Sequence, residues 1–371
     1  MPSASGGPSA RQPTPSGSLE PPPVDHAPGR GRAATFARNW GPWLVVIASL
    51  AWVGHVVKWH ELYVIARQAP IERIVFWSSL FLIANCAADT FATLYTFRWF
   101  GCRVPFRELY VMRAATYLLA IVQYYVGQAA LVAWLHQRKR VPVVQGSGWI
   151  LFISGINLGV LLLFAAAGLL TVRRDVPWTW IEPAAVGVGV VVLLYAALIQ
   201  LAPRALVNLP LLGPLFEMGV VGHVKATVVR VPHVMLLVVW HYYMMNAFGV
   251  HPPPLVAFAL LPVMFFATAL PISVQGVGPT QAVAVLFFTQ YAGPAGKAGV
   301  LAYSLGTTSI SFLLQGVMGL AFLAPARKLG MPEHPVAEVR EDAAEDARDE
   351  QRRRVPLAEP VMETVGKAKP L

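Results

Sequence analysis

Residues 269–281 interrupt an otherwise apolar part of the chain and constrain its fold more than any other stretch. Two prolines and two glycines fall within residues 271–279, between apolar runs at 255–269 and 282–291. In lipid, a helix that stops and restarts leaves backbone groups unpaired. Such a break persists only when it is buried in protein or faces a water-filled cavity. The first question is therefore whether this chain lies in a membrane.

The composition indicates that it does. Hydrophobic residues make up 56% of the chain and charged residues only 13%, whereas about 25% of a typical soluble domain is charged. Residues 326–371 hold nine of the 29 Lys and Arg and ten of the 19 Asp and Glu, so the net charge of +10 comes from the apolar body before them. A basic body that spans a membrane favours contact with anionic lipid head groups. No basic run is interleaved with stacking aromatics, so no nucleic-acid partner is expected.

The charge pattern also divides the chain into three parts. Residues 1–38 are rich in Pro, Gly and Ser, which predicts a disordered N-terminus. They lack a cleavable signal-peptide pattern, so we expect the first span to stay in place as an anchor. Residues 39–325 form the transmembrane domain, and residues 326–371 form a charged tail. Basic residues beside the first and last spans place both termini in the cytoplasm.

We predict an all-α protein, a polytopic transmembrane helix bundle of about 7–8 spans with two broken or re-entrant segments, in the cell inner membrane. The spans are expected at residues 40–58, 74–95, 149–172, 178–201, 226–248, 255–270 and 298–323.

The first broken segment is predicted from its length. Residues 106–135 would make a straight helix of about 45 Å, which exceeds a hydrocarbon core of about 30 Å. Basic residues flank both ends of this segment, and the positive-inside rule then puts both ends in the cytoplasm. A re-entrant hairpin that turns between Gln123 and Gly127 satisfies both constraints.

The two broken segments occupy comparable places in two halves of the membrane body, which predicts an internal repeat. Paired Gly- or Pro-interrupted segments of this kind point to a transporter-type binding site. An alternative interpretation is that the glycines only allow close helix packing. The candidate lipid-binding residues are Gln123, Tyr124, Gly127 and Gln128 in the first segment, and Pro271, Ser273, Gln275, Gly276, Gly278, Thr280 and Gln281 in the second.

Few ionisable residues remain at membrane depth, and such residues are usually paired or face a cavity. We expect Asp89 and Arg113 to form an ion pair at the cytoplasmic mouth, with Arg98 near it. The alternative is a purely structural pair, or an Arg113 whose charge reaches the interface. Cys86 and Cys102 give neither a disulfide framework nor metal-ligand spacing. We expect no metal and no cofactor.

The second broken segment carries a resemblance to a known family. Residues 270–282, Leu-Pro-Ile-Ser-Val-Gln-Gly-Val-Gly-Pro-Thr-Gln-Ala, resemble Pro-Ile-Ser-Ile-x-Gly-x-Gly-x-Arg-Glu, a signature of the lysylphosphatidylglycerol synthase transmembrane (flippase-like) family. Residues 97–99 and 104–107, followed by the run to Gly127, are similar to that family's first motif. The resemblance covers about residues 40–323, and it implies lipid handling within the membrane, including flipping of aminoacylated phosphatidylglycerol. The tail is too short to be the soluble aminoacyl-transferase domain of the related synthases.

The chain departs from the family pattern at its charged positions. Gln123 stands where the family has Pro, Gln128 where it has an acidic residue, and Thr280-Gln281 where it has Arg-Glu. A glutamine keeps hydrogen bonding but loses charge and titration. Proton coupling or lysyl recognition through these positions is therefore not expected, and a neutral or phosphate-bearing head group fits better.

These features predict a protein that binds a phospholipid or polyprenyl-type lipid and moves it between leaflets. The alternative is an accessory membrane subunit that presents lipid to a separate transferase or glycosyltransferase. An enzyme acting on lipid by itself is disfavoured, because the nucleophile-elbow, phosphate-loop and zinc-protease motifs are all missing from the sequence.

Overall fold

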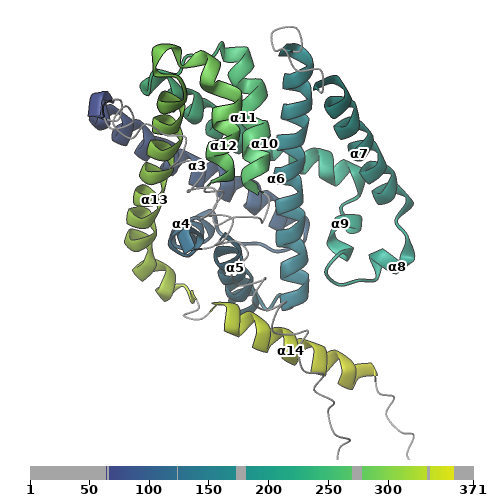
Figure 1. Ribbon diagram of the computed structural model, residues 1–371. Coiled ribbons are helices and arrows are strands. Elements are labelled where there is room, and N and C mark those ends of the chain that lie inside the picture. The colour runs from purple at the N-terminus through teal and green to yellow at the C-terminus, as the bar shows by residue number, and fades with distance from the viewer. Residues whose placement is uncertain are drawn as a thin grey trace, which may run out of the picture. The chain divides into compact units, whose positions relative to one another are not determined.

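The computed structural model describes residues 64, 67–122, 124–172, 181–269, 278–331 and 335–354. These residues form twelve α-helices, α3 to α14, and two short 3-10 turns, so the predicted all-α fold is confirmed for this part of the chain (Figure 1). The span predicted at residues 40–58 lies outside the described residues.

Four of the described helices are long and apolar enough to cross a membrane. They are α3 (Ile71–Trp99), α6 (Val143–Val172), α10 (Gly219–Ala247) and α13 (Gly296–Lys328). Each has between 29 and 33 residues, whereas about 20 apolar residues suffice to span a bilayer. Two further apolar helices, α7 (Ile181–Leu201) and α11 (Pro254–Ala269), are shorter. By length and composition, these helices make the chain a multi-pass membrane protein.

Large apolar side chains cover much of the outer surface of these helices. Leu193 and Leu194 on α7 are 71% and 65% exposed, and Leu313 and Leu320 on α13 are 63% and 61% exposed. A soluble monomer rarely exposes large contiguous apolar patches. In a bilayer these side chains contact lipid tails instead of water, so their exposure carries no hydrophobic cost. This surface therefore fits a protein that lies in a membrane.

The first broken segment consists of two helices, α4 (Phe106–Val122) and α5 (Tyr124–Lys139), which pack against each other. Of the break predicted across residues 123–127, Gln123 lies outside the described residues, and residues 124–127 belong to the first turn of α5. A hairpin of two packed helices therefore occupies the position of the single long helix that the segment is too long to form.

The second broken segment follows the same plan. Helix α11 is followed by α12 (Pro279–Phe288), against which it packs, and then by two 3-10 turns, η2 (Thr289–Tyr291) and η3 (Gly293–Ala295). Residues 270–277, which connect α11 to α12, lie outside the described residues.

Two helix pairs pack most extensively, α4 with α13 and α6 with α11. In both pairs a glycine brings the helices together. A Cβ on Gly319 of α13 would lie 2.6 Å from Cβ of Leu118 on α4, and a Cβ on Gly168 of α6 would lie 2.4 Å from Cα of Ala259 on α11. Small residues at such crossings let helix backbones approach closely where lipid supplies no hydrophobic drive.

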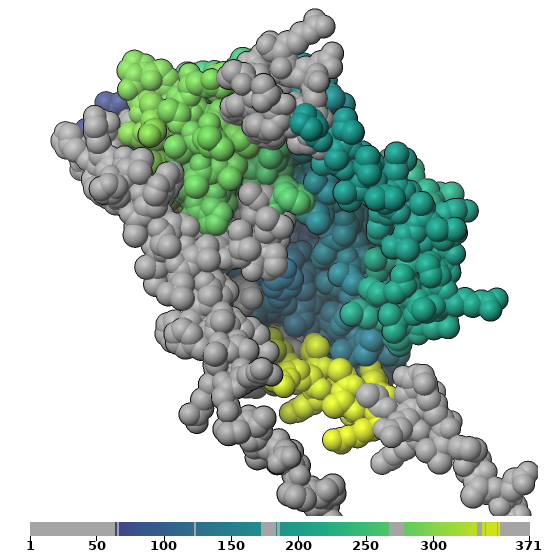
Figure 2. Space-filling model, turned by 45° about the vertical axis from the view of Figure 1, so that its right-hand side comes forward, coloured from purple at the N-terminus to yellow at the C-terminus, as the bar shows by residue number. Residues whose placement is uncertain are grey.

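The short helices α8 (Arg204–Val207) and α9 (Gly213–Glu217) connect α7 to α10, and α14 (Pro335–Arg354) follows α13. Helix α14 packs against α5 and α6, and Figure 2 shows it in yellow against their blue surface. A carboxylate oxygen of Asp346 accepts a hydrogen bond from the Val143 N–H at 2.9 Å. Because Val143 is the first residue of α6, the tail supplies a cap to a membrane helix. The predicted boundary between residues 325 and 326 falls inside α13.

Candidate functional site

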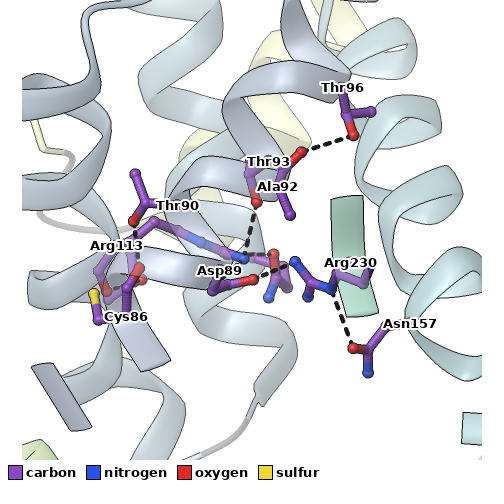
Figure 3. A network of polar contacts seen from close by, with 11 residues as sticks. Cys86, Asp89, Thr90, Ala92, Thr93, Thr96, Arg113, Asn157 and Arg230 are labelled. Carbon is purple, nitrogen blue, oxygen red and sulfur yellow. Dashed lines mark hydrogen bonds and ion pairs between the residues drawn. The ribbon is translucent and has the colours of Figure 1, made fainter. Parts of the chain in front are cut away.

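Three charged side chains meet in the interior of the bundle. One carboxylate oxygen of Asp89, on α3, lies 2.5 Å from Nη2 of Arg113 on α4, and its other oxygen lies 2.5 Å from Nη1 of Arg230 on α10 (Figure 3). All three residues are only 5% exposed. The predicted contact between Asp89 and Arg113 is present, and Arg230 adds a second cation to it.

The cluster lies far from the ends of the helices that carry it. At a rise of 1.5 Å per residue, Asp89 is about 15 Å from the C-terminal end of α3. Arg230 is about 16 Å from the N-terminal end of α10 by the same measure. Both helices are candidate membrane spans. Charges at such depth are costly, so they are rare and usually functional or paired.

Hydrogen bonds extend the cluster to two more helices. Arg113 donates to Oε1 of Gln128 on α5 at 3.3 Å and to Oγ1 of Thr93 on α3 at 3.4 Å. Arg230 donates from Nε to Oδ1 of Asn157 on α6 at 3.2 Å. Five helices, α3, α4, α5, α6 and α10, thus converge on one polar centre, which we call the charge cluster (Asp89, Arg113 and Arg230).

The charge cluster has an excess of positive charge. Among the described residues, Asp89 is the carboxylate that pairs with the two arginines. Several nearby polar atoms have no hydrogen-bond partner in the described part of the chain, including Nε of Arg113, Oδ1 of Asn85 and Nδ1 of His233. His233 follows Arg230 by one helical turn and interacts electrostatically with Asp89. The centre is therefore polar, cationic and not saturated by its own hydrogen bonds.

The first broken segment contributes directly to this centre. Gln128 contacts Arg113, as described above, and Gly127 beside it packs against α4. A Cβ on Gly127 would lie 3.1 Å from the carbonyl oxygen of Thr116, so the glycine permits the close approach of α5. Tyr124 is 45% exposed at the start of α5. The three described candidate residues of this segment thus divide into one that contacts the charge cluster, one that allows packing, and one on the surface.

The second broken segment uses its glutamine differently. Oε1 of Gln281 accepts a hydrogen bond from the backbone N–H of Gly278 at 2.6 Å, and Nε2 of Gln281 donates to Oγ1 of Thr308 on α13 at 3.5 Å. Gly278 has φ of 94°, a conformation that favours glycine. Gln281 is fully buried, so its amide caps α12 and joins it to α13.

Of the remaining candidate residues, the structure describes Arg98 and Thr280. Arg98 is exposed in the last turn of α3, with its guanidinium 5.8 Å from the ring centroid of Tyr95, and it lies outside the charge cluster. Thr280 is half-buried in the first turn of α12. Pro271, Ser273, Gln275 and Gly276 lie outside the described residues.

Arg230 and Asn157 are the residues that sequence reasoning missed. Arg230 is the one charged residue within the span predicted at 226–248, so the rule that singled out Asp89 applies equally to it. Asn157 gave a weaker signal, because a neutral amide in an apolar span is less costly than a charge.

Within the described ranges, no group of three or more His, Cys, Asp or Glu side chains is arranged to hold a metal ion. The expectation that the protein uses no metal and no cofactor stays a prediction. In comparisons with known proteins, the chain matches no family model, no curated protein and no solved structure.

Proposed function

We propose that this protein binds a phospholipid or polyprenyl-linked lipid in the cell inner membrane and moves it between leaflets. The charge cluster is the observation that carries the proposal. It holds two arginines against one carboxylate at the depth of the candidate spans and contacts Gln128 of a broken segment. An apolar chain of lipid can stay in the bilayer while its polar head group reaches such a centre.

The order and packing of the helices support this proposal through an inverted repeat. We take α3, α4–α5 and α6 as one unit and α10, α11–α12 and α13 as the other. The hairpin helix α4 packs on α13, and its counterpart α11 packs on α6, so the hairpin of each half packs against the last helix of the other half. With the chain entering as the positive-inside rule requires, the two hairpins enter from opposite sides. Transporters built in this way place their site between the repeats.

The resemblance to the flippase-like family points in the same direction. The resemblance rests on residues 270–282 and on the first motif, and it implies a role in handling membrane lipid. Lysyl head groups fit poorly, because a centre with excess positive charge repels a cationic ligand. An anionic or uncharged head group fits the charge cluster better.

The proposal is tested by reconstitution. The full-length protein is incorporated into phosphatidylcholine vesicles with a trace of phosphatidylglycerol that carries a fluorophore on one chain, and dithionite then bleaches the outer-leaflet probe. Transport is expected to expose the inner-leaflet probe as well. The Arg230→Gln variant should lose this exposure, whereas Arg204→Gln, which changes an exposed arginine on α8, should keep it.

Vesicles that contain wild-type protein and protect the inner-leaflet probe as well as protein-free vesicles do would contradict the proposal. A repeat of the assay with a fluorescent polyprenyl phosphate separates the two classes of lipid.

A further inference from the structure

The way in which Asp89 contacts its two arginines is the starting point for a more specific inference. Its two oxygens are divided between the two cations, Oδ2 with Arg113 and Oδ1 with Arg230. A phosphate group with two non-bridging oxygens offers the same arrangement. Guanidinium groups bind carboxylate and phosphate oxygens through the same fork of donors.

The donors of the two arginines are not exhausted by Asp89. Nε of Arg113 has no hydrogen-bond partner among the described residues, although Arg113 is 95% buried. An unpaired buried donor is costly unless a ligand or water completes it. The neighbouring Nδ1 of His233 is also buried and unpaired within the described ranges.

The charge count decides which anion fits. Two arginines and one aspartate leave one positive charge in a site that is shielded from water, and an isolated charge there is strongly unfavourable. A ligand with one negative charge brings the cluster to neutrality while Asp89 stays ionised. A phosphodiester carries one negative charge, whereas a phosphomonoester carries about 1.5 to 2 at pH 7 and would leave an excess.

We infer that Arg113 and Arg230 form a binding site for a monoanionic phosphodiester. Before the ligand binds, Asp89 occupies the two arginines as an internal carboxylate, and the ligand then takes over part of its contacts with them. This inference rests on the proposed function only for the source of the diester, which is a lipid head group if the protein moves phospholipid. Gln128, at the first broken segment, holds Arg113 in place for the ligand.

The experiment measures binding rather than transport. Full-length protein in a neutral detergent is titrated with two probes, dimethyl phosphate as a free diester and dihexanoyl-phosphatidylglycerol as a lipid below its micelle concentration. Dihexanoyl-glycerol, which lacks phosphate, is the control ligand. Calorimetric titration gives the affinity, and the thermal midpoint of the protein gives an independent readout.

We expect at least one diester probe to bind the wild-type protein, and we expect the diacylglycerol control to bind much more weakly. Arg113→Gln and Arg230→Gln should each weaken diester binding at least about tenfold, because each removes one charged partner of the ligand. Arg230→Lys should restore part of that affinity, and Arg204→Gln on α8 should leave it unchanged.

Asp89→Asn supplies a result that misfolding cannot imitate. The substitution removes the internal competitor, and the loss of its negative charge raises the net charge of the site by one. Asp89→Asn should therefore bind the diester probe more tightly than the wild type, and the probe should raise its thermal midpoint by a larger amount. This gain keeps the test decisive even if an arginine variant does not fold.

The inference is overturned if the wild type binds neither diester, if both arginine variants bind as the wild type does, or if Asp89→Asn binds more weakly. Binding of dimethyl phosphate with equal or greater affinity than the lipid supports the site and assigns it to a free anion. Diester binding without transport in vesicles sinks the proposed function and leaves the site standing, whereas transport without arginine-dependent binding does the reverse.

Discussion

The two broken segments share a plan in sequence and differ in what their glutamines do. Each has an apolar helix, a break, and a second helix with a glutamine among its first five residues. Gln128 accepts a hydrogen bond from Arg113 of the charge cluster. Gln281 accepts a hydrogen bond from the Gly278 N–H at the start of its own helix and donates one to Thr308 on α13. One glutamine thus contacts buried charges, and the other completes a helix terminus.

The surroundings of the two segments differ in the same sense. The first lies beside a buried aspartate and two buried arginines. In the second half, α10 and α13 are joined by a hydrogen bond of 2.7 Å between Nδ1 of His241 and the hydroxyl of Tyr303. The charge cluster itself takes Asp89 and Arg113 from the first unit and Arg230, on α10, from the second. The comparison predicts that mutations in the first segment change ligand binding and that mutations in the second change stability.

The largest effect is expected from Asp89→Ala, which leaves Arg113 and Arg230 buried without their counter-charge. Breaking a buried pair by removing one partner costs about 3–5 kcal/mol. The variant should have a much lower thermal midpoint in detergent, measured through fluorescence-detected size exclusion. Asp346→Ala removes only a hydrogen bond at the start of α6, so it should shift the midpoint far less. Equal shifts for the two variants would show that the charge cluster has no special weight.

A smaller effect is expected at the crossing of α13 with α4, which joins the two halves. A Cβ on Gly319 would meet the backbone nitrogen of Leu118 at 2.7 Å, whereas a Cβ on Gly316 would meet only a side-chain methyl of Ile121 at 3.6 Å. Gly319→Ala should therefore destabilise the protein by about 1–3 kcal/mol through overpacking. Gly316→Ala, one turn away on the same helix, is the matched control and should be tolerated. Thermal midpoints of the two variants decide the matter.

The glutamines test the comparison directly. Gln281→Leu removes the acceptor of the Gly278 N–H and should cost about 0.5–2 kcal/mol, the usual cost of a lost cap. Gln128→Leu leaves Arg113 with Asp89 and Thr93, so it should change stability less and weaken diester binding more. When stability and diester binding are measured in both variants, Gln281→Leu should lose mainly stability and Gln128→Leu mainly binding. A parallel loss of stability and binding in each variant would remove the distinction between the two segments.

The smallest effect is expected from thiol chemistry next to the first segment. Cys102, in the turn between α3 and α4, is 8% exposed, and burial raises the pKa of its thiol. The thiolate is the reactive form, so a raised pKa lowers the reactivity of the thiol at neutral pH. The reactivity returns only as the pH rises towards that pKa. Cys86 on α3 is fully buried. Maleimide should therefore label the native protein slowly at pH 7 and rapidly after denaturation. Fast labelling of native protein at Cys102 would show that this turn opens.

Much of the fold could be predicted from the sequence because the bilayer imposes strong constraints. Apolar runs of sufficient length predicted α3, α6, α10 and α13, although the start of α10 lies at Gly219 instead of residue 226, and the excess length of residues 106–135 indicated the break between α4 and α5. The contact of Asp89 with Arg113 followed from the cost of an isolated charge. Each of these inferences needed only local composition and one physical rule.

The site itself could be predicted only in part, because it depends on distances across the bundle. The pairing of Arg230 with Asp89 joins residues that are far apart in sequence, and no local pattern gives their separation. The direction of a single side chain is equally hidden, since Gln128 and Gln281 have the same chemistry and opposite uses. Helix crossings set by Gly168 and Gly319 decide which faces meet, and those crossings are properties of the assembled bundle.

The cap that Asp346 gives to Val143 has a practical consequence for anyone who shortens this chain. The first N–H groups of a helix have no partner within it, and here one of them is completed by a residue 203 positions later. This hydrogen bond thus closes a loop of the chain that runs from the start of α6 to α14 and contains α7 to α13. A truncation placed before residue 335 opens that loop, while one placed after residue 354 preserves it. Expression trials of the two truncated chains should therefore differ in yield of monodisperse protein.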